Sequence, residues 1–135
     1  MRVYLDTNVI VSAFIARGLS SEVFKIILAE HQLVLSTTVL EELQKVLSDK
    51  IKLPSSQIKE IIEFLNNFEV ISNFDINKSV RLRDSDDIPI LSAALFGKTD
   101  ILITGDKDLL IVNEKYGLKI ITPREFLKLV KIKKT

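Results

Sequence analysis

Acidic and polar side chains follow two short apolar runs of this 135-residue chain, at residues 3–5 and 101–103. These side chains are Asp6 and Asn8 after the first run, and Thr104, Asp106 and Asp108 after the second. In open α/β sheets the ligand crevice lies beyond the carboxyl ends of the strands, so chemistry is expected at these positions. Each carboxylate taken singly is also compatible with a plain helix N-cap or turn residue.

Helical periodicity adds a third acid, Glu42, beside the apolar face of residues 37–47. The apolar stripe of this segment is centred on Leu43, and at about 100° per residue Glu42 lies at its border while Glu41 lies nearly opposite. We therefore expect Glu42 to reach inward along the sheet and Glu41 to be solvated. The alternative is that Glu42 also turns outward, as acidic side chains flanking a stripe normally do.

A run of acids, Asp84-Ser85-Asp86-Asp87, precedes another segment of helical period. Asp87 stands four residues before Leu91, so it projects from the same face as the apolar stripe of that segment, whereas Asp86 points away. The alternative is that Asp87 is simply the N-cap of the helix. Asp84 is expected in the preceding turn.

Four carboxylates beside one crevice, with Asp106 or Asp108 as the fourth, need a neutralising charge. Two ionised carboxylates about 4 Å apart repel by about 4 kcal/mol at an effective dielectric constant near 20, which destabilises a fold or raises their pKa values. Lys107 or Arg83 could supply counter-charges, but a divalent cation needs fewer assumptions. Because the chain has no Cys and only one His, the donors are oxygens, which favours Mg²⁺ or Mn²⁺ over Zn²⁺. Carboxylate-held Mg²⁺ usually acts on phosphates, so phosphodiester hydrolysis is the expected reaction class.

Short β-rich runs alternate with segments of helical period along the whole chain. The expected strands are residues 3–5, 33–35, 101–103 and 119–121, and the expected helices are residues 21–30, 37–47, 57–66, 87–96 and 123–130. Start signals for these helices are Ser20 or Ser21, Thr37, Ser55-Ser56, and Thr122 followed by Pro123. Residues 69–83 are expected to be mostly loop, with Val70-Ile71 as a candidate edge strand. The alternation predicts an α/β fold, a doubly wound sandwich around a mainly parallel sheet.

Length and composition predict one soluble globular domain spanning residues 1–135. Hydrophobic residues make up 47% and charged residues 27% of the chain, which excludes disordered and collagen-like classes, and the net charge of +1 does not by itself indicate a nucleic-acid binder. The absence of Cys suits a reducing compartment, so we expect a cytoplasmic protein. The apolar run at residues 9–16 is far shorter than the roughly 18 residues of a spanning helix, so no membrane association is expected. The basic end, residues 131–135, is expected to be frayed.

Taken in order, the acidic motifs resemble those of the PIN-domain nucleases, and more specifically the small single-domain toxins (VapC-like) of bacterial and archaeal toxin–antitoxin pairs. The motifs are Asp6-Thr7-Asn8, Leu40-Glu41-Glu42-Leu43, Asp84-Ser85-Asp86-Asp87 before Ile90-Leu91-Ser92-Ala93-Ala94, and Thr104-Gly105-Asp106-Lys107-Asp108-Leu109-Leu110. The resemblance covers essentially the whole chain. It implies a single PIN-like, Rossmann-like domain: a three-layer α/β/α sandwich with a central, mainly parallel sheet.

The resemblance also implies roles for individual residues. The acids expected to hold Mg²⁺ or Mn²⁺ and to be catalytic are Asp6, Glu42, Asp87 and Asp106. Asn8 and Thr104 are expected to orient the carboxylates and water through hydrogen bonds, with Asp108 and Asp84 as auxiliary groups. The residues leave open whether Asp106 or Asp108 is the fourth acid, and whether one ion or two bind.

The function implied is metal-dependent hydrolysis of RNA, with an antitoxin protein as partner. A homodimer is a further hypothesis, since the paired apolar residues of 57–65 could leave a patch exposed. The lysines expected to touch RNA phosphates are Lys128, Lys131, Lys133 and Lys134. The aromatic side chains at helical positions that indicate core rather than base stacking are Phe14, Phe24, Phe64 and Phe126.

Three alternatives are weighed against this prediction. A response-regulator-like receiver fits worse because the run 33–35 ends in Ser36 rather than in an acceptor Asp. A haloacid-dehalogenase-like phosphatase, or another Mg²⁺-dependent phosphate-ester hydrolase, fits worse because Asn8 stands where an Asp-x-Asp motif has its second acid. The third alternative, from a different class, is a catalytically silent module of this fold that binds RNA or a protein.

Overall fold

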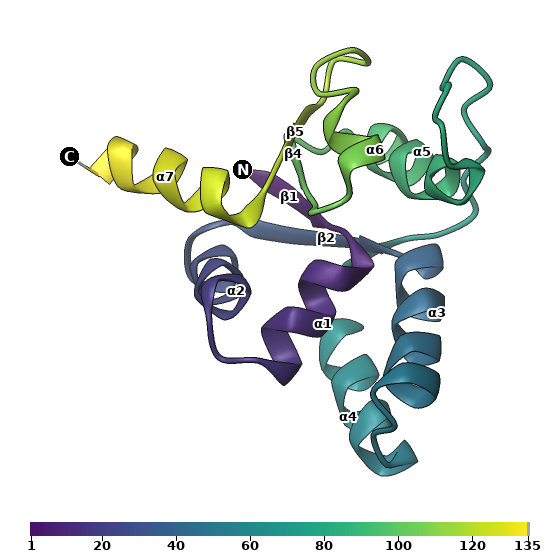
Figure 1. Cartoon of the computed structure of the whole chain (residues 1–135), viewed down its shortest axis with the longest axis vertical. Coiled ribbons are helices and arrows are strands. Elements are labelled where there is room, and N and C mark those ends of the chain that lie inside the picture. Colours follow the sequence, from purple (N-terminus) through teal and green to yellow (C-terminus); the bar gives the residue numbers. More distant parts are fainter. Residues whose placement is uncertain (135) are drawn as a thin grey trace.

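The computed structural model describes residues 1–134, with side chains through residue 131, and shows five parallel strands in the order β3-β2-β1-β4-β5 (Figure 1). The strands are β1 (Arg2–Leu5), β2 (Gln32–Ser36), β3 (Glu69–Ile71), β4 (Ile101–Ile103) and β5 (Lys119–Ile121). The α-helices are α1 (Thr7–Ile15), α2 (Leu19–Glu30), α3 (Thr37–Lys45), α4 (Ser55–Leu65), α5 (Ile88–Phe96), α6 (Lys107–Leu110) and α7 (Pro123–Lys134), with a π-helical turn η1 (Val46–Lys50) and a 3-10 turn η2 (Ser85–Asp87). This is the predicted α/β/α sandwich, and its sheet is parallel throughout.

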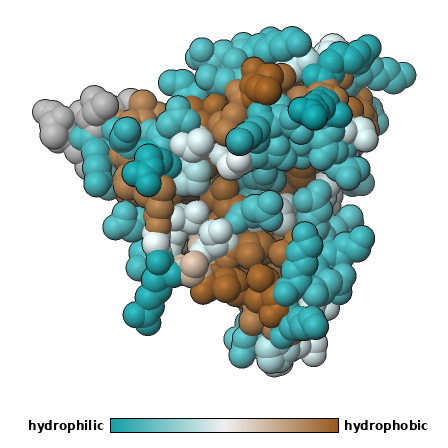
Figure 2. Space-filling model, viewed as in Figure 1, coloured by the Kyte–Doolittle hydropathy of each residue, from teal (hydrophilic) through white to brown (hydrophobic). Residues whose placement is uncertain are grey.

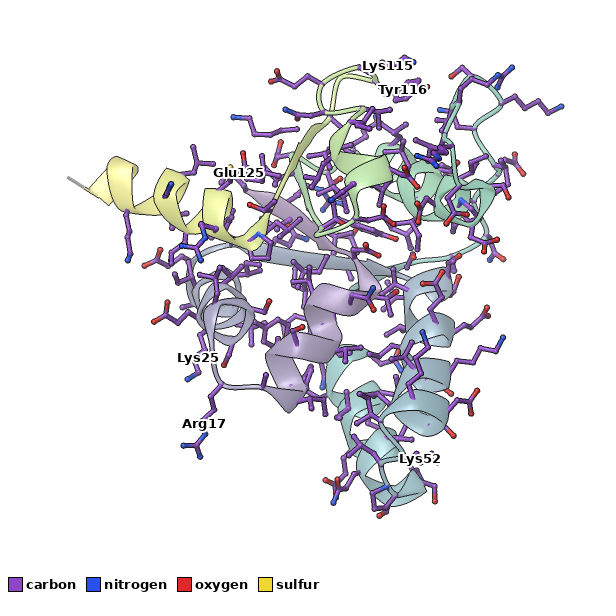
Figure 3. All side chains as sticks on the ribbon, viewed as in Figure 1. Arg17, Lys25, Lys52, Lys115, Tyr116 and Glu125 are labelled. Atoms are coloured by element: carbon purple, nitrogen blue, oxygen red, sulfur yellow. The ribbon has the colours of Figure 1, made fainter. Side chains whose placement is uncertain are left out.

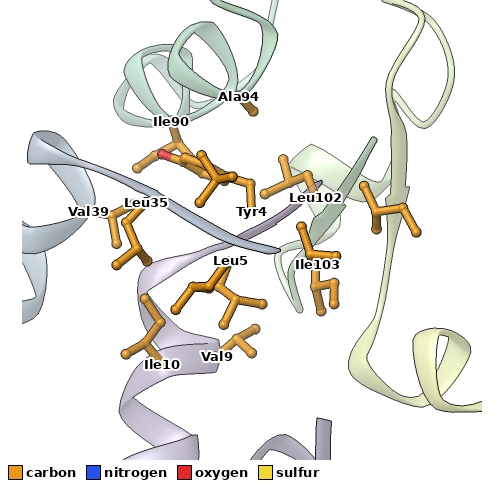
Figure 4. Close-up of a cluster of buried hydrophobic side chains, with 14 of the residues drawn as sticks. Tyr4, Leu5, Val9, Ile10, Leu35, Val39, Ile90, Ala94, Leu102 and Ile103 are labelled. Atoms are coloured by element: carbon orange, nitrogen blue, oxygen red, sulfur yellow. The ribbon is translucent and has the colours of Figure 1, made fainter. Parts of the chain in front are cut away.

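The core lies on both faces of the sheet. Alternate strand residues point to opposite sides: Tyr4 lies toward α5, where Ile90 packs on it, and Leu5 lies toward α1, where Ile10 packs (Figure 4). Helices α1, α2 and α7 cover one face and α5 covers the other, with α3 and α4 extending beyond the end of β2 (Figure 1). Burial on both faces explains why the strands read as continuous apolar runs.

Every strand expected from the sequence is present, including the edge strand β3 around Val70-Ile71. Helix α1 was not predicted, because residues 9–16 are apolar on nearly all sides and show no amphipathic stripe. The structure shows why this helix is so apolar: it packs between the sheet, α2 and α3, with Val9 and Ile10 buried. The single turn α6 was also missed, because four residues are too few for a period to show.

The first residues and caps of the helices were predicted less accurately than the positions of the helices themselves. Helix α2 begins at Leu19 after Gly18, so the start signals at Ser20 and Ser21 are wrong. Helix α3 is capped by Ser36, whose Oγ accepts a hydrogen bond from the Val39 N–H at 3.2 Å, rather than by Thr37. The signal at the start of α7 is confirmed. Its Thr122 Oγ1 accepts from the Glu125 N–H, and Glu125 Oε1 accepts from the Thr122 N–H, both at 3.1 Å.

Exposed apolar side chains gather over the ends of α1 and α4, on the lower half of the molecule (Figures 1 and 2). Ile15 and Phe64 are 43% and 41% exposed there. The prediction that Phe64 belongs to the core is therefore wrong: its ring lies at the surface, with centroids 6.3 Å from Phe14 and 5.4 Å from Phe68. A groove of about 520 Å³ runs nearby between η1 and α4, lined by Ile58 among others.

Helix α7 continues to Lys134, past the end predicted for it. The side chains of residues 132–135 lie outside the described residues, and so do the phosphate contacts predicted for Lys133 and Lys134. The expected fraying of residues 131–135 stays a prediction. Among the helices of residues 1–134, none has the length and apolar character needed to cross a membrane.

Candidate metal centre

The site lies at the point where the order in which successive strands join the sheet reverses. From the central strand β1 the chain moves outward to β2 and β3 on one side, and then to β4 and β5 on the other. The crevice between the carboxyl ends of β1 and β4 is the position at which open α/β sheets bind ligands. Asp6 follows β1 and Thr104 follows β4, and the Thr104 hydroxyl donates a hydrogen bond to Asp6 Oδ2 at 2.7 Å.

Asp6 both caps helix α1 and presents a carboxylate oxygen to the crevice. Its Oδ1 accepts a hydrogen bond from the Thr7 N–H at 2.7 Å, so it caps α1, while Oδ2 faces Thr104 in the crevice. The side chain is only 8% exposed. Burial raises the pKa of Asp6, the hydrogen bonds from Thr104 and Thr7 oppose this, and the charge of Asp106 adds to the rise.

Glu42 reaches the same crevice from the first turns of α3. It is half-buried, whereas Glu41 is exposed, which confirms the orientation expected from the helical period. Its Oε2 accepts a hydrogen bond at 2.9 Å from the hydroxyl of Thr7, itself 3% exposed. Burial raises the pKa of Glu42, against the Thr7 hydrogen bond, and the nearby charge of Asp6 raises it further.

Asp87 is the most perturbed acid of the site. It ends the turn η2 and stands at the N-cap position of α5, as the alternative expected, but its side chain makes no capping hydrogen bond. The turn is capped instead by Asp84, whose Oδ1 accepts from the Asp86 N–H at 2.9 Å. Asp87 is 9% exposed, and its Oδ2 is buried with no hydrogen-bond partner among the described residues. Burial raises the pKa of Asp87 to about 7. The charge of Asp106, a side-chain interaction with the Asp106 carboxyl that favours the protonated form, and the charges of Asp84 and Asp6 contribute to that rise.

Asp106 is held by the loop after β4. Its N–H donates to the Thr104 Oγ1 at 3.0 Å, and its Oδ1 accepts from the Asp108 N–H at 2.8 Å, capping α6. Thr104 therefore contacts Asp6 through its hydroxyl hydrogen and Asp106 through its oxygen. The charge of Asp106 raises the pKa of both Asp6 and Asp87.

The auxiliary positions divide into two kinds. One carboxylate oxygen each of Asp84, Asp87 and Asp108 lies within 4.8 Å of the other two, so the two auxiliary acids group with Asp87, the one member of the predicted quartet in this set. Asn8 is exposed and makes no hydrogen bond to the acids described here. Thr7, which the sequence analysis passed over, holds Glu42 instead. No local pattern indicated this role, because the helix that Thr7 opens was itself not predicted.

No ion pair neutralises these acids within the described side chains. The ion pairs found there join Arg2 to Glu69 and Lys59 to Glu63, and neither Lys107 nor Arg83 takes part in one. Arg17, Lys25 and Lys52 project from the lower part of the molecule, away from α5 and α6 (Figure 3). A buried carboxylate oxygen without a donor, among acids without a counter-charge, is the chemistry expected of a hard-cation site. The residues present therefore fit Mg²⁺ or Mn²⁺.

Comparison with known proteins shows the family to which the chain belongs. A match to the PIN domain covers residues 2–108, so the chain belongs to the PIN-domain family, whose members are generally nucleases. The fold is similar to that of a chain in the crystal structure of VapBC2 from Rickettsia felis bound to a DNA fragment from their promoter. The TM-score is 0.60 and the sequence identity 20%, over 90% of this chain and 98% of that one. No curated protein matches the chain.

Proposed function

We propose that this protein is a metal-dependent endoribonuclease and the toxin of a toxin–antitoxin pair. The observation that carries the proposal is the buried, unpartnered oxygen of Asp87, which lies among further acids at the switch point of a PIN-domain sheet. Such a carboxylate is costly to the fold unless a cation neutralises it. A nuclease can use such a cation to polarise phosphoryl oxygens and to activate water.

Four acids would hold the ion: Asp6, Glu42, Asp87 and Asp106. When bound, Mg²⁺ or Mn²⁺ supplies the positive charge that polarises phosphoryl oxygens and lowers the pKa of a water molecule. Thr104 fixes Asp6 and the loop of Asp106, and Thr7 fixes Glu42, so the oxygens are preorganised by hydrogen bonds of 2.7 to 3.0 Å.

RNA as substrate and an antitoxin as partner are the finer parts of the proposal. The family supports a nucleic-acid substrate, and the fold shared with the VapBC2 chain supports a partner protein. The exposed apolar side chains around Phe64 leave a surface that a partner or a second copy could cover. A light-scattering mass equal to that of the monomer across micromolar concentrations would remove the homodimer. The protein is expected to act in the cytoplasm.

The test is cleavage of a mixed pool of end-labelled RNA with Mn²⁺, with Mg²⁺ and with EDTA. Wild type and Asp87→Asn are purified side by side, with Glu41→Gln as a matched control for loss of one acidic charge. We expect cleavage by wild type and Glu41→Gln in either metal, and none in EDTA or by Asp87→Asn. Cleavage that persists in EDTA or in Asp87→Asn would reject the site.

Absence of cleavage separates the remaining alternatives. If Mn²⁺ still raises the melting temperature of wild type but not of Asp87→Asn, the metal site stands and a restricted RNA target or another phosphate ester becomes the better hypothesis. If there is neither cleavage nor a metal-induced shift, the catalytically silent binding module is the better explanation.

A further inference from the structure

Two buried hydroxyls, those of Tyr4 and Ser36, meet between β1 and the end of β2. Tyr4 Oη and Ser36 Oγ lie 2.7 Å apart, so one hydroxyl donates a hydrogen bond to the other. Both residues are 0% exposed. A buried phenol needs such a partner, but a phenylalanine at position 4 would fill the same apolar space against Ile90 without requiring one (Figure 4). The pair of hydroxyls therefore does something that packing of the core alone does not require.

The hydrogen bond joins a strand to the start of a helix. In the pairing of β1 with β2, Tyr4 is opposite Val34 and is the last paired residue of β1. Ser36 lies two positions beyond Val34 and pairs with Ile71 of β3 instead. Ser36 is also the N-cap of α3, since its Oγ accepts from the Val39 N–H at 3.2 Å. The Tyr4–Ser36 bond thus attaches the first turn of α3 to β1 at a point beyond the pairing of the two strands.

These two elements carry two of the candidate ligands. Asp6 follows β1, two residues after Tyr4, and Glu42 lies in the second turn of α3, six residues after Ser36. The hydrogen bond from Thr7 to Glu42, at 2.9 Å, is a second link between the same parts of the chain. A helix attached at one point can turn about it, whereas attachment at its first residue and in its second turn fixes its direction. Both links therefore set the distance between the two carboxylates.

We propose that Tyr4, acting through Ser36, is a positioning residue of the metal site: it holds α3 so that Glu42 faces the ion that Asp6 also binds. Ligands of a functional site have to be held within about 0.5 Å of their productive positions by the groups behind them. The inference rests on the function proposed above, because it concerns a ligand of that site. Tyr4 itself would touch neither ion nor substrate, so its hydroxyl would affect metal affinity without being a ligand.

The test measures the affinity of purified full-length protein for Mn²⁺ by calorimetric titration, without nucleic acid and at a temperature at which circular dichroism shows each variant folded. Tyr4→Phe removes one hydroxyl of the pair and keeps the ring, and Ser36→Ala removes the other. We expect each to bind Mn²⁺ about 10-fold more weakly, the lower end of the range of about 10- to 100-fold for loss of an outer-shell partner. Ser36→Thr keeps a hydroxyl that can cap α3 and meet Tyr4, so it should recover most of the affinity.

The matched control is Thr99→Val, which removes another buried hydroxyl. Thr99 is 9% exposed, and its Oγ1 donates to the Ala94 carbonyl at 3.0 Å. It precedes β4 and so lies at the amino edge of the sheet, away from the crevice. Loss of this hydrogen bond lowers stability as loss of the Tyr4 hydroxyl does, but Mn²⁺ affinity should stay at the wild-type level.

A double-mutant cycle shows whether Tyr4 acts through Glu42. In a Glu42→Ala background, Tyr4→Phe should cause no further loss of Mn²⁺ affinity, because the ligand that it positions is already gone. A further loss of about 10-fold in that background would mean that Tyr4 supports Asp6 or the core in general. That result would overturn the proposal. If Tyr4→Phe does not fold, Ser36→Ala takes its place in the cycle.

The remaining outcomes separate this proposal from the proposed function. Unchanged affinity in folded Tyr4→Phe, or an equal loss in Thr99→Val, would overturn the positioning role, while Mn²⁺-dependent cleavage of RNA by wild type would leave the function standing. If wild type bound Mn²⁺ but cleaved no RNA, the proposed function would fail and the cycle would still decide the role of Tyr4. Absence of Mn²⁺ binding by wild type would reject both.

Discussion

Glu69 and Asp87 lie at opposite edges of the same sheet and differ in what surrounds their charge. At the amino edge, Glu69 accepts hydrogen bonds from the Arg2 guanidinium at 2.8 and 2.6 Å and from Gln32 at 3.0 Å. The hydrogen bond and charge of Arg2 lower the pKa of Glu69. At the carboxyl edge, Asp87 has no cationic neighbour of this kind, and burial among other acids raises its pKa to about 7.

The ionised form of Glu69 therefore stabilises the folded state, whereas the ionised form of Asp87 destabilises it. Arg2 also donates to the Gly97 carbonyl at 2.7 Å, and its N–H donates to Asp100 Oδ2 at 2.7 Å, so one side chain and its backbone tie β3, α5 and β4 to β1. Nothing comparable joins the elements at the carboxyl edge through opposite charge within the described residues. Groups with pKa values perturbed in this direction are concentrated at functional sites.

The largest effect expected from this comparison is on metal-free stability. Burial among other acids raises the pKa of Asp87 to about 7, so the ionised carboxylate destabilises the folded protein. Asp87→Asn should therefore raise the free energy of unfolding in EDTA above pH 7 by about 2 kcal/mol, since solvent screens part of the unfavourable interaction, as measured by urea denaturation. A variant less stable than wild type would show that Asp87 stabilises the fold.

The same pKa values predict how stability changes with pH. Unfolded Asp87 loses its proton near its ordinary pKa of 3.8 and folded Asp87 near 7, so between those values the folded state binds more protons. Metal-free wild type should lose stability as the pH rises through this window, and Asp87→Asn should lose much less. Glu69 has the opposite sign, because its lowered pKa gives stability that is lost as the pH falls. Parallel pH profiles for wild type and Asp87→Asn would contradict the assignment.

The sequence was sufficient to predict the five strands, five of the seven α-helices and the edge of the sheet at which the candidate acids lie. Continuous apolar runs indicated buried parallel strands, and the helical period correctly oriented Glu42 inward and Glu41 outward. Position after a strand indicated the edge at which Asp6 and Asp106 lie, because parallel strands end together. These inferences succeeded because each depends on the periodicity of apolar residues or on the order of elements along the chain, and both can be read directly from a sequence.

Other features depend on contacts between distant segments and could not be read in this way. The hydrogen bond from Thr7 to Glu42 joins residues 35 positions apart, and the one from Thr104 to Asp6 joins residues 98 positions apart. Helix α1 was missed because its residues are apolar on nearly all sides, which leaves no amphipathic stripe in the sequence. The proximity of Asp84 to Asp108 required the fold of two loops, which no local pattern specifies.

The next largest effect concerns the hydrogen bond that holds Glu42. Thr7→Val keeps the branched shape of a buried side chain but removes the hydroxyl that donates to Glu42 Oε2. Loss of an outer-shell partner of this kind typically lowers metal affinity about 10- to 100-fold. Calorimetric titration with Mn²⁺ should show that loss, and Thr7→Ser, which restores the hydroxyl, should recover most of the affinity. Equal affinities in Thr7→Val and wild type would mean that Glu42 does not hold the ion.

A smaller effect is expected at the amino edge, and on stability alone. Glu69→Gln should lower the free energy of unfolding by about 1 kcal/mol, since the ion pair is partly exposed and solvent screens it. RNA cleavage and Mn²⁺ binding should stay at the wild-type level, because this pair lies at the amino ends of β1 and β3 and the crevice lies at the carboxyl ends of the strands. A double-mutant cycle with Arg2→Ala isolates the pairwise energy. A loss of cleavage in folded Glu69→Gln would show that the two edges are coupled.

The smallest effect is expected from Glu41→Gln, which removes one negative charge from the same helix that carries Glu42. Glu41 is exposed and screened by water, so the change in the free energy of unfolding should stay within about 0.5 kcal/mol. Mn²⁺ affinity should fall far less than in Thr7→Val, although Thr7→Val changes no charge at all. If Glu41→Gln lowered Mn²⁺ affinity as strongly as Thr7→Val does, the metal would be attracted by the summed negative charge of α3. Directed oxygens such as that of Glu42 would then not be its ligands, and the contrast between the two edges would reduce to net charge.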